Sequence, residues 1–254
     1  MSPLAADLAR ALDPVALAVG AGMVCDPWQA DVLRTDHPRV LLNCSRQSGK
    51  STTCATKAVH VAVYEPGSLI LLLSPSQRQS GELFRKVQAV YRLLGRPVSA
   101  DGESATTLTL ENGSRIVSLP GTEGTIRAYS AVRLLLIDEA ARVPDETVAA
   151  VRPMLAVSGG QLIALSTPYG RRGWWYDAWE NGGPSWKRVR IPASECPRIS
   201  AQFLAEERAA LGSWFYAQEY ECEFAETDAQ LFSEEALRAM FNARLVPLFP
   251  TEEG

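Results

Sequence analysis

The chain has 254 residues, 46% of them hydrophobic, and a formal net charge of −4 at pH 7. This length suits one large α/β domain with a substantial core, and the negative charge argues against a protein that coats nucleic acid over its whole surface. No apolar run reaches the roughly 20 residues that a membrane span needs, and the N-terminus lacks the order of a signal peptide. We therefore expect a soluble, intracellular protein without a membrane partner.

The cysteines predict reduced, mostly buried thiols. Their number is odd, and their spacing lacks the pairs that bind a metal. With only His37 and His60 as histidines, a zinc site is not expected. The five cysteines are Cys25, Cys44, Cys54, Cys196 and Cys222.

Apolar periodicity and turn residues predict alternating helices and strands. The Asn-Gly pair at 112–113 is a strong hairpin signal. The alternation implies an α/β fold with a mainly parallel sheet and helices on both faces. The expected strands are 40–42, 69–73, 107–110, 115–118, 133–137, 161–166 and 186–192, and the expected helices are 4–20, 26–35, 50–64, 77–94, 144–157 and 201–224.

A candidate phosphate-binding loop follows the first expected strand. Gly49 lets the backbone approach phosphate closely, Lys50 reaches the β and γ phosphates, and the Ser51 hydroxyl can ligate Mg²⁺. Backbone N–H groups at the start of the next helix complete the anion site. Cys44 stands where the usual pattern has its first glycine, so the loop alone is an imperfect match. The residues assigned to nucleotide binding here are Ser45, Arg46, Gln47, Ser48, Gly49, Lys50, Ser51 and Thr52.

A buried strand over 133–137 leads directly into two acids, Asp138 and Glu139. The carboxyl ends of parallel strands are where α/β sheets bind ligands. Asp138 is therefore expected to hold Mg²⁺ and Glu139 to orient the attacking water. The alternative is a helix N-cap at Asp138 beside a solvated Glu139, which the phosphate loop makes less favoured.

The strand over 161–166 ends in a third polar element, Ser166 and Thr167, which would emerge at the same sheet edge and sense the γ-phosphate or the attacking water. A plain strand end before Pro168 is the alternative. Upstream, Gln29 can hydrogen-bond an adenine at two positions and so select ATP over GTP.

Together these elements resemble the ATPase motor of the large terminase subunit of tailed bacteriophages. The resemblance covers about residues 25–235 and implies a RecA-like, ASCE-type P-loop fold. One departure is Ala128, where the family usually has glycine after the arginine. The matching segments are Pro27-Trp28-Gln29, Arg46 to Ser51, Ser74 to Gln77, Ile126-Arg127-Ala128, Leu136 to Ala141, and Ser166 to Gly170.

The resemblance also implies roles for single residues. Arg46 would contact the γ-phosphate in cis, with a structural salt bridge as its alternative. Arg127 would complete a neighbouring subunit's site in a ring, with Arg142 as runner-up. Thr167 would couple hydrolysis to DNA movement through the segment around Arg171-Arg172, whose aromatic neighbours fit core packing better than base stacking.

The resemblance further divides the chain into an ATPase core over 1–180 and a lid or linker over 181–254 that leads toward a metal-dependent nuclease absent here. Nuclease activity is not expected. Implied partners are duplex DNA, a portal ring, a small terminase subunit and further copies of the chain, which alone could be monomeric, in the cytoplasm of an infected bacterium. The alternatives are a helicase-like DNA-dependent ATPase and an ATP-binding scaffold without turnover.

Overall fold

The computed structural model describes residues 2–120 and 129–225. Its strands are β1 (Arg39–Cys44), β2 (Leu69–Ser74), β3 (Ala100–Glu103), β4 (Thr107–Leu110), β5 (Arg115–Pro120), β6 (Leu134–Asp138), β7 (Gln161–Ser166) and β8 (Lys187–Ile191). Its α-helices are α1 (Pro3–Leu12), α2 (Pro14–Gly20), α3 (Pro27–Arg34), α4 (Lys50–Tyr64), α5 (Gln77–Leu93), α7 (Asp145–Val151), α8 (Gly173–Glu180), α9 (Ala201–Ala210) and α10 (Ser213–Tyr220). Short 3₁₀ turns are η1 (Ala140–Arg142), η2 (Arg152–Leu155), η3 (Gly183–Ser185) and η4 (Ala193–Glu195).

All of the described strands join one sheet in the order β3-β4-β5-β2-β6-β7-β1-β8. Every pair from β5 to β8 is parallel, whereas β4 is antiparallel to both of its neighbours. The prediction of a mainly parallel sheet is confirmed, and the predicted hairpin is β4-β5. The strand β7 lies between β1 and β6, so the three strands that carry the predicted site are adjacent.

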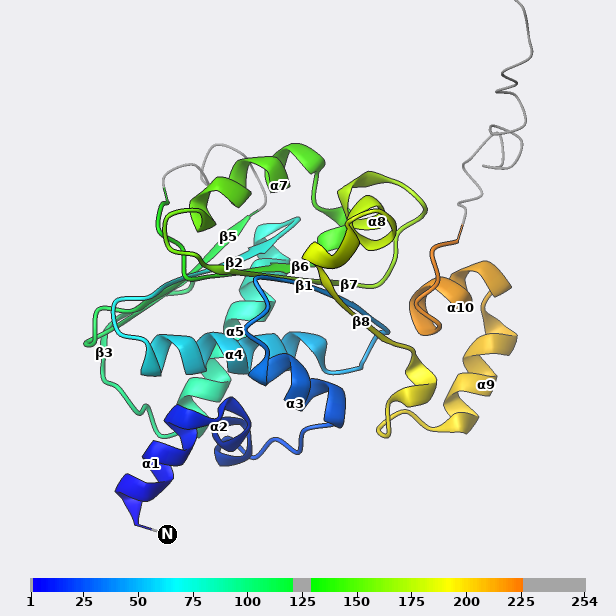
Figure 1. Cartoon of the computed structure of the whole chain (residues 1–254). Coiled ribbons are helices and arrows are strands. Elements are labelled where there is room, and N and C mark those ends of the chain that lie inside the picture. The colour runs from blue at the N-terminus through cyan, green and yellow to red at the C-terminus, as the bar shows by residue number, and fades with distance from the viewer. Residues whose placement is uncertain (1, 121–128, 226–254) are drawn as a thin grey trace, which may run out of the picture.

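Helices cover both faces of the sheet, with α7 and α8 on one face and α3, α4 and α5 on the other (Figure 1). Alternate residues of each central strand enter two separate apolar clusters. On β1, for example, Leu42 packs toward α4 and α5, whereas Leu41 packs toward α7 and α8. Because both faces are covered, β2, β6 and β7 are continuous apolar runs rather than alternating ones.

Three expected helices are interrupted. The helix expected over 4–20 breaks at Asp13, which adopts an extended conformation and caps α2, while Pro14 occupies the first turn of that helix. The helix expected over 144–157 changes to a 3₁₀ turn at 152–155, which contains Pro153. The helix expected over 201–224 divides into α9 and α10, because Leu211 and Gly212 are extended.

The sheet continues beyond residue 180, since β8 pairs in parallel with β1. This strand lies inside the segment that the sequence assigned to a lid or linker. The strand β3 was not predicted, because its residues Ala-Asp-Gly-Glu lack apolar alternation and are mostly exposed.

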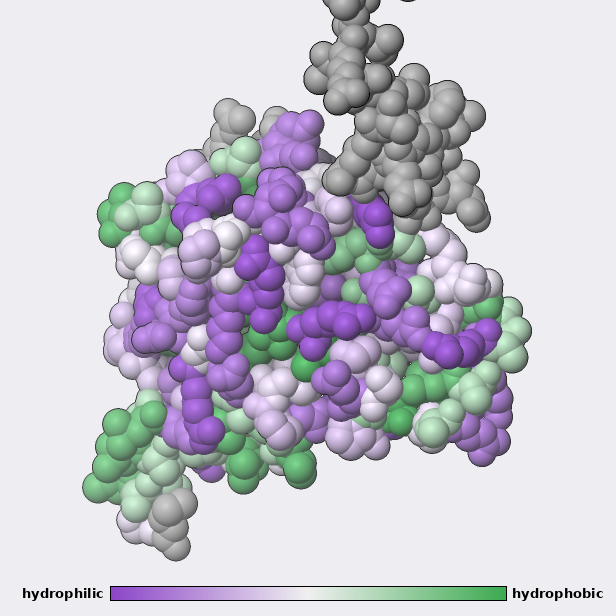
Figure 2. Space-filling model, turned by 45° about the vertical axis from the view of Figure 1, so that its right-hand side comes forward, coloured by the Kyte–Doolittle hydropathy of each residue, from purple (hydrophilic) through white to green (hydrophobic). Residues whose placement is uncertain are grey.

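The helix α1 lies at the molecular edge and exposes the leucines Leu4, Leu8 and Leu12, so hydrophobic surface gathers there in Figure 2. Within the described residues, no helix has the length and apolar character needed to cross a membrane.

Candidate functional site

The loop between β1 and α4 has the backbone that a phosphate-binding loop requires. Gly49 has φ +92° and caps α4, and Gln47 also has a positive φ of 59°. The first N–H groups of a helix have no partner within the helix and point at whatever lies before it. The 15-residue helix α4 therefore presents donors and the positive end of its dipole to an anion.

Replacing Gly49 with alanine should destabilise the protein more than the same change at Gly67. Both residues have positive φ, which costs alanine roughly 1 kcal/mol. A Cβ at Gly49 would in addition lie 2.8 Å from Gln29 Nε2, whereas one at Gly67 meets nothing within 4 Å. Gln29 is 2% exposed and its Oε1 accepts from Asp26 N–H, so its amide cannot move away easily.

We expect an additional loss of about 1–3 kcal/mol for Gly49→Ala from this overpacking, measured as the free energy of unfolding in urea. Equal losses for the two variants would show that the Gln29 contact is not restrictive.

Lys50 is buried beneath the loop, and its Nζ donates to the carbonyls of Cys44 at 3.0 Å and Ser45 at 3.2 Å. An ammonium group has three donors, so one N–H remains for a phosphate oxygen. The Ser48 hydroxyl is also buried and has no hydrogen-bond partner among the described residues. The loop thus combines the Lys50 ammonium group with a hydroxyl donor that has no partner among the described residues.

Asp138 and Ser51 meet across the sheet edge. The Ser51 hydroxyl donates to Asp138 Oδ2 at 3.4 Å, while Asp138 Oδ1 accepts from the Glu139 N–H at 3.0 Å. Burial raises the pKa of Asp138 above its ordinary value, and the neighbouring carboxylate of Glu139 adds to this. A divalent cation would favour the charged form again, and hydroxyl and carboxylate oxygens are the ligands that Mg²⁺ prefers. These two residues therefore fit the magnesium role that was predicted for them.

Glu139 has an unusual backbone for a non-glycine residue, with φ 51° directly after β6. Such conformations cost of order 1–3 kcal/mol and cluster at functional sites. Its carboxylate accepts from Arg142 Nη1 at 3.1 Å and is about one-third exposed. The structure therefore contains a partly accessible acid next to the buried Asp138, and the N-cap alternative fails because Asp138 is the last residue of β6, not a helix cap.

Arg46 forms the ion pair that was considered as its alternative role. Its Nε lies 2.6 Å from Glu219 Oε2 on α10, and the Arg46 side chain is 58% exposed while that of Glu219 is 1% exposed. Burial raises the pKa of Glu219, but hydrogen bonds from Arg46 and Gln218 outweigh it and hold this pKa below its ordinary value. Contact of Arg46 with a phosphate stays a prediction.

The end of β7 lies between the loop and the acids. The register pairs Ser166 with Asn43 of β1, and Asp138 with Leu165. Ser166 and Thr167 are both buried, and the Ser166 hydroxyl lacks a hydrogen-bond partner within the described part of the chain. The sheet thus brings β1, β6 and β7 together at one edge, as the sequence predicted.

Gln29 contacts the phosphate loop from α3. Its Oε1 closes a capping box with Asp26, which leaves Nε2 directed at Gly49. The sequence predicted this residue as a reader of adenine, a role that stays a prediction. Arg127, the predicted trans arginine, lies outside the described residues.

The sequence missed Arg198, which joins the start of α3 to the phosphate loop. Its guanidinium donates to both carboxylate oxygens of Asp26, at 2.9 and 2.7 Å, and to the Ser48 carbonyl at 2.9 Å. Next to it lies an open cleft of about 570 Å³, within the range of small-molecule sites. The cleft is lined by Arg46, Gln47, Arg198, Ile199, Ser200, Phe203 and Tyr220.

The tryptophans on α8, after β7, pack into the core as predicted. Trp175 is 1% exposed within the cluster beneath α7 and α8, and Trp174 Nε1 donates to the Val143 carbonyl at 3.1 Å.

Comparison with known proteins assigns this chain to a family. The family model for the large terminase subunit, T4likevirus-type, N-terminal, matches residues 41–239. The large terminase subunit of Escherichia phage T5 is 22% identical over 204 residues, which are 77% of this chain and 46% of that protein. The chain thus spans less than half the length of this curated relative.

Solved structures agree in fold. The large terminase ATPase domain of Thermus phage P74-26 superposes with a TM-score of 0.72 at 21% identity, covering 82% of this chain and 97% of that one. The large terminase of a thermophilic bacteriophage, solved in complex with ADP, gives a TM-score of 0.64 at 13% identity, over 78% and 53% of the two chains. The fold is therefore that of a RecA-like P-loop ATPase domain, and the chain belongs to the family of the large terminase subunit, T4likevirus-type, N-terminal.

Proposed function

We propose that this chain is the ATP-hydrolysing motor domain of a phage genome-packaging terminase, which couples turnover to the translocation of duplex DNA. The observation that carries the proposal is the meeting of Lys50 and Ser51 with Asp138 and Glu139 at the carboxyl edge of β1 and β6. The family supports the packaging context, and a binding-only scaffold has no need for a water-orienting acid beside the metal ligand.

The residues divide the chemistry between them. The backbone N–H groups of α4, the free N–H of Lys50 and the Ser48 hydroxyl would hold the phosphates. Ser51 and Asp138 would hold Mg²⁺, whose charge would offset the negative charge of the phosphates. Glu139 would accept a hydrogen bond from the attacking water and align it with the γ-phosphate.

Four further residues would adjust this reaction. Arg46 would leave Glu219 to contact the γ-phosphate, and Thr167 would pass the phosphate state to the segment after β7. Gln29 would select adenine. Arg127 would act in trans within a ring of identical subunits, where removing such an arginine costs on the order of 10³-fold or more in rate.

We also infer that the lid or linker predicted over 181–254 begins only after the sheet strand β8 and that its described part closes on the nucleotide. Arg198 and Glu219, which belong to it, reach the phosphate loop at Ser48 and Arg46. The proposed partners are duplex DNA, a portal ring, a small terminase subunit and further copies of this chain, in the host cytoplasm.

The test is steady-state ATP hydrolysis with Mg²⁺ over a wide range of protein concentration, with and without duplex DNA. We expect a rate per subunit that rises with concentration, because a neighbour completes each site, and that disappears when the divalent cation is chelated. A flat rate would remove the trans arginine but keep the ATPase. Absence of turnover even with DNA would favour the scaffold, and strand separation on duplex DNA would favour the helicase.

A further inference from the structure

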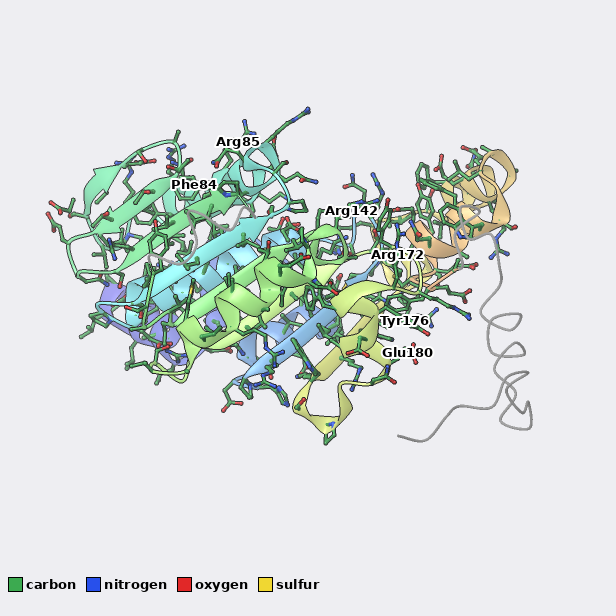
Figure 3. The ribbon with its side chains drawn as sticks, turned by 90° about the horizontal axis from the view of Figure 1, so that it is seen from above. Phe84, Arg85, Arg142, Arg172, Tyr176 and Glu180 are labelled. Atoms are coloured by element: carbon green, nitrogen blue, oxygen red, sulfur yellow. The ribbon has the colours of Figure 1, made fainter. Side chains whose placement is uncertain are left out.

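Arg142 connects the acid after β6 to an aromatic ring after β7. Its Nη1 donates to Glu139 Oε2 at 3.1 Å, and its guanidinium carbon lies 4.6 Å from the centroid of the Tyr169 ring. A cation within about 6 Å of a ring centroid is attracted by the ring's quadrupole. Arg172 lies over the same ring at 5.6 Å, near the limit of that range. Figure 3 labels Arg142 and Arg172, which lie near each other at the end of the sheet.

Resting on the proposed function, we infer that Arg142 and Tyr169 are positioning residues for Glu139. Glu139 directly precedes the η1 turn and Arg142 ends it, three residues later, and an exposed pair at this spacing contributes little by itself. Here the pair is about two-thirds buried, and the ring fixes the guanidinium from a second strand end.

The geometry suits an acid that orients water. Arg142 contacts one carboxylate oxygen, Oε2, and no donor among the described residues hydrogen-bonds to Oε1, so Oε1 is left to accept from water. A base that is itself held by a third group is the general arrangement of activated catalytic sites. Tyr169 acts one step further out, since its ring contacts the Arg142 guanidinium and no hydrogen bond between the described residues joins it to the Glu139 carboxylate.

This arrangement also gives a physical route between β7 and the acid. Tyr169 follows Thr167 by two residues, so a shift of the segment after β7 would move the ring, and the ring would move Arg142. The same contact assigns Arg142 to its own subunit's site, which argues against the role in trans for which it was the runner-up.

The test compares kcat and KM for ATP in Arg142→Ala, Tyr169→Leu, Tyr169→Phe and the double variant Arg142→Ala/Tyr169→Leu. We expect kcat to fall about 10-fold or more in Arg142→Ala, since small misplacements of a catalytic group are costly. In Tyr169→Leu, kcat should fall about 3-fold. In Tyr169→Phe, kcat should stay closer to the wild-type value because the ring is kept. KM for ATP should change little in all of them.

Two results would overturn the inference. One is equal losses in Tyr169→Phe and Tyr169→Leu, which would exclude the ring contact. The other is a double variant that multiplies the two single losses, because residues acting in series are not additive. Arg115→Ala, which removes an exposed arginine at the other end of the sheet, is the matched control.

Mixing subunits separates the cis role from the trans role. If Arg142 acts on its own Glu139, combining Arg142→Ala with Glu139→Gln subunits leaves every site defective. Recovery of turnover in the mixture would show that Arg142 acts in trans and would overturn the inference while leaving the ATPase intact. A wild-type chain without turnover would instead overturn both the proposed function and this inference.

Discussion

Glu139→Gln should lower kcat for ATP hydrolysis by about 10²–10⁴-fold while leaving ATP affinity within a few-fold of wild type. The amide cannot accept the water's proton or orient it as a carboxylate does, yet it keeps the size of the side chain. Phosphate binding depends on Lys50 and the α4 N-terminus, which this change does not touch. The measurement is single-turnover hydrolysis together with binding of a fluorescent ATP analogue.

The matched control is Glu146→Gln, which makes the same change on an exposed residue in the first turn of α7. It should leave kcat unchanged. If Glu139→Gln also hydrolyses ATP at the wild-type rate, the water-orienting acid is not at the end of β6. If it loses ATP binding instead, its role is to shape the site rather than to act on water.

The sequence predicted the parts of the site whose functional residues lie within a few positions of one another at the end of a strand. Gly49 and Lys50 follow an apolar strand and open a helix, and Asp138 and Glu139 end a second apolar strand. In a parallel sheet, carboxyl ends share an edge, so the meeting of Ser51 with Asp138, 87 residues apart, follows from topology.

The contacts that could not be predicted join residues that are far apart in the sequence and that belong to no recognisable motif. Arg198 reaches Ser48 across 150 residues, and Glu219 reaches Arg46 across 173. Glu219 comes from a segment in which the sequence predicted one continuous helix, and Arg198 lies just before that segment. The break at Gly212 separates α9 from α10 and allows α10 to approach the phosphate loop. Helical periodicity predicts a helix but not where that helix packs.

Arg46→Ala and Glu219→Gln should separate the structural from the catalytic role of their ion pair. Arg46→Ala leaves a buried carboxylate with Gln218 as its remaining side-chain donor among the described residues. Breaking a buried pair costs about 3–5 kcal/mol, but Arg46 is mostly exposed, so we expect a loss of roughly 1–3 kcal/mol in the free energy of unfolding. If Arg46 also meets the γ-phosphate, kcat should fall on the order of 10³-fold.

Glu219→Gln removes the other partner of the ion pair. It leaves Arg46 exposed to solvent without its carboxylate partner, and it keeps the size of the buried side chain on α10. We expect a small loss in the free energy of unfolding at neutral pH, because the ionised carboxylate contributes stability there. Hydrogen bonds hold the pKa of Glu219 below its unfolded value. The stability that the ionised carboxylate contributes is therefore present above the unfolded pKa and is lost as pH falls through the folded pKa. We expect the free energy of unfolding to fall more steeply with decreasing pH in the wild type than in Glu219→Gln. If Arg46 must leave Glu219 to reach a phosphate, Glu219→Gln should lower KM for ATP with kcat retained. An unchanged KM in Glu219→Gln, together with a wild-type kcat in Arg46→Ala, would leave the pair as a structural link between the loop and α10.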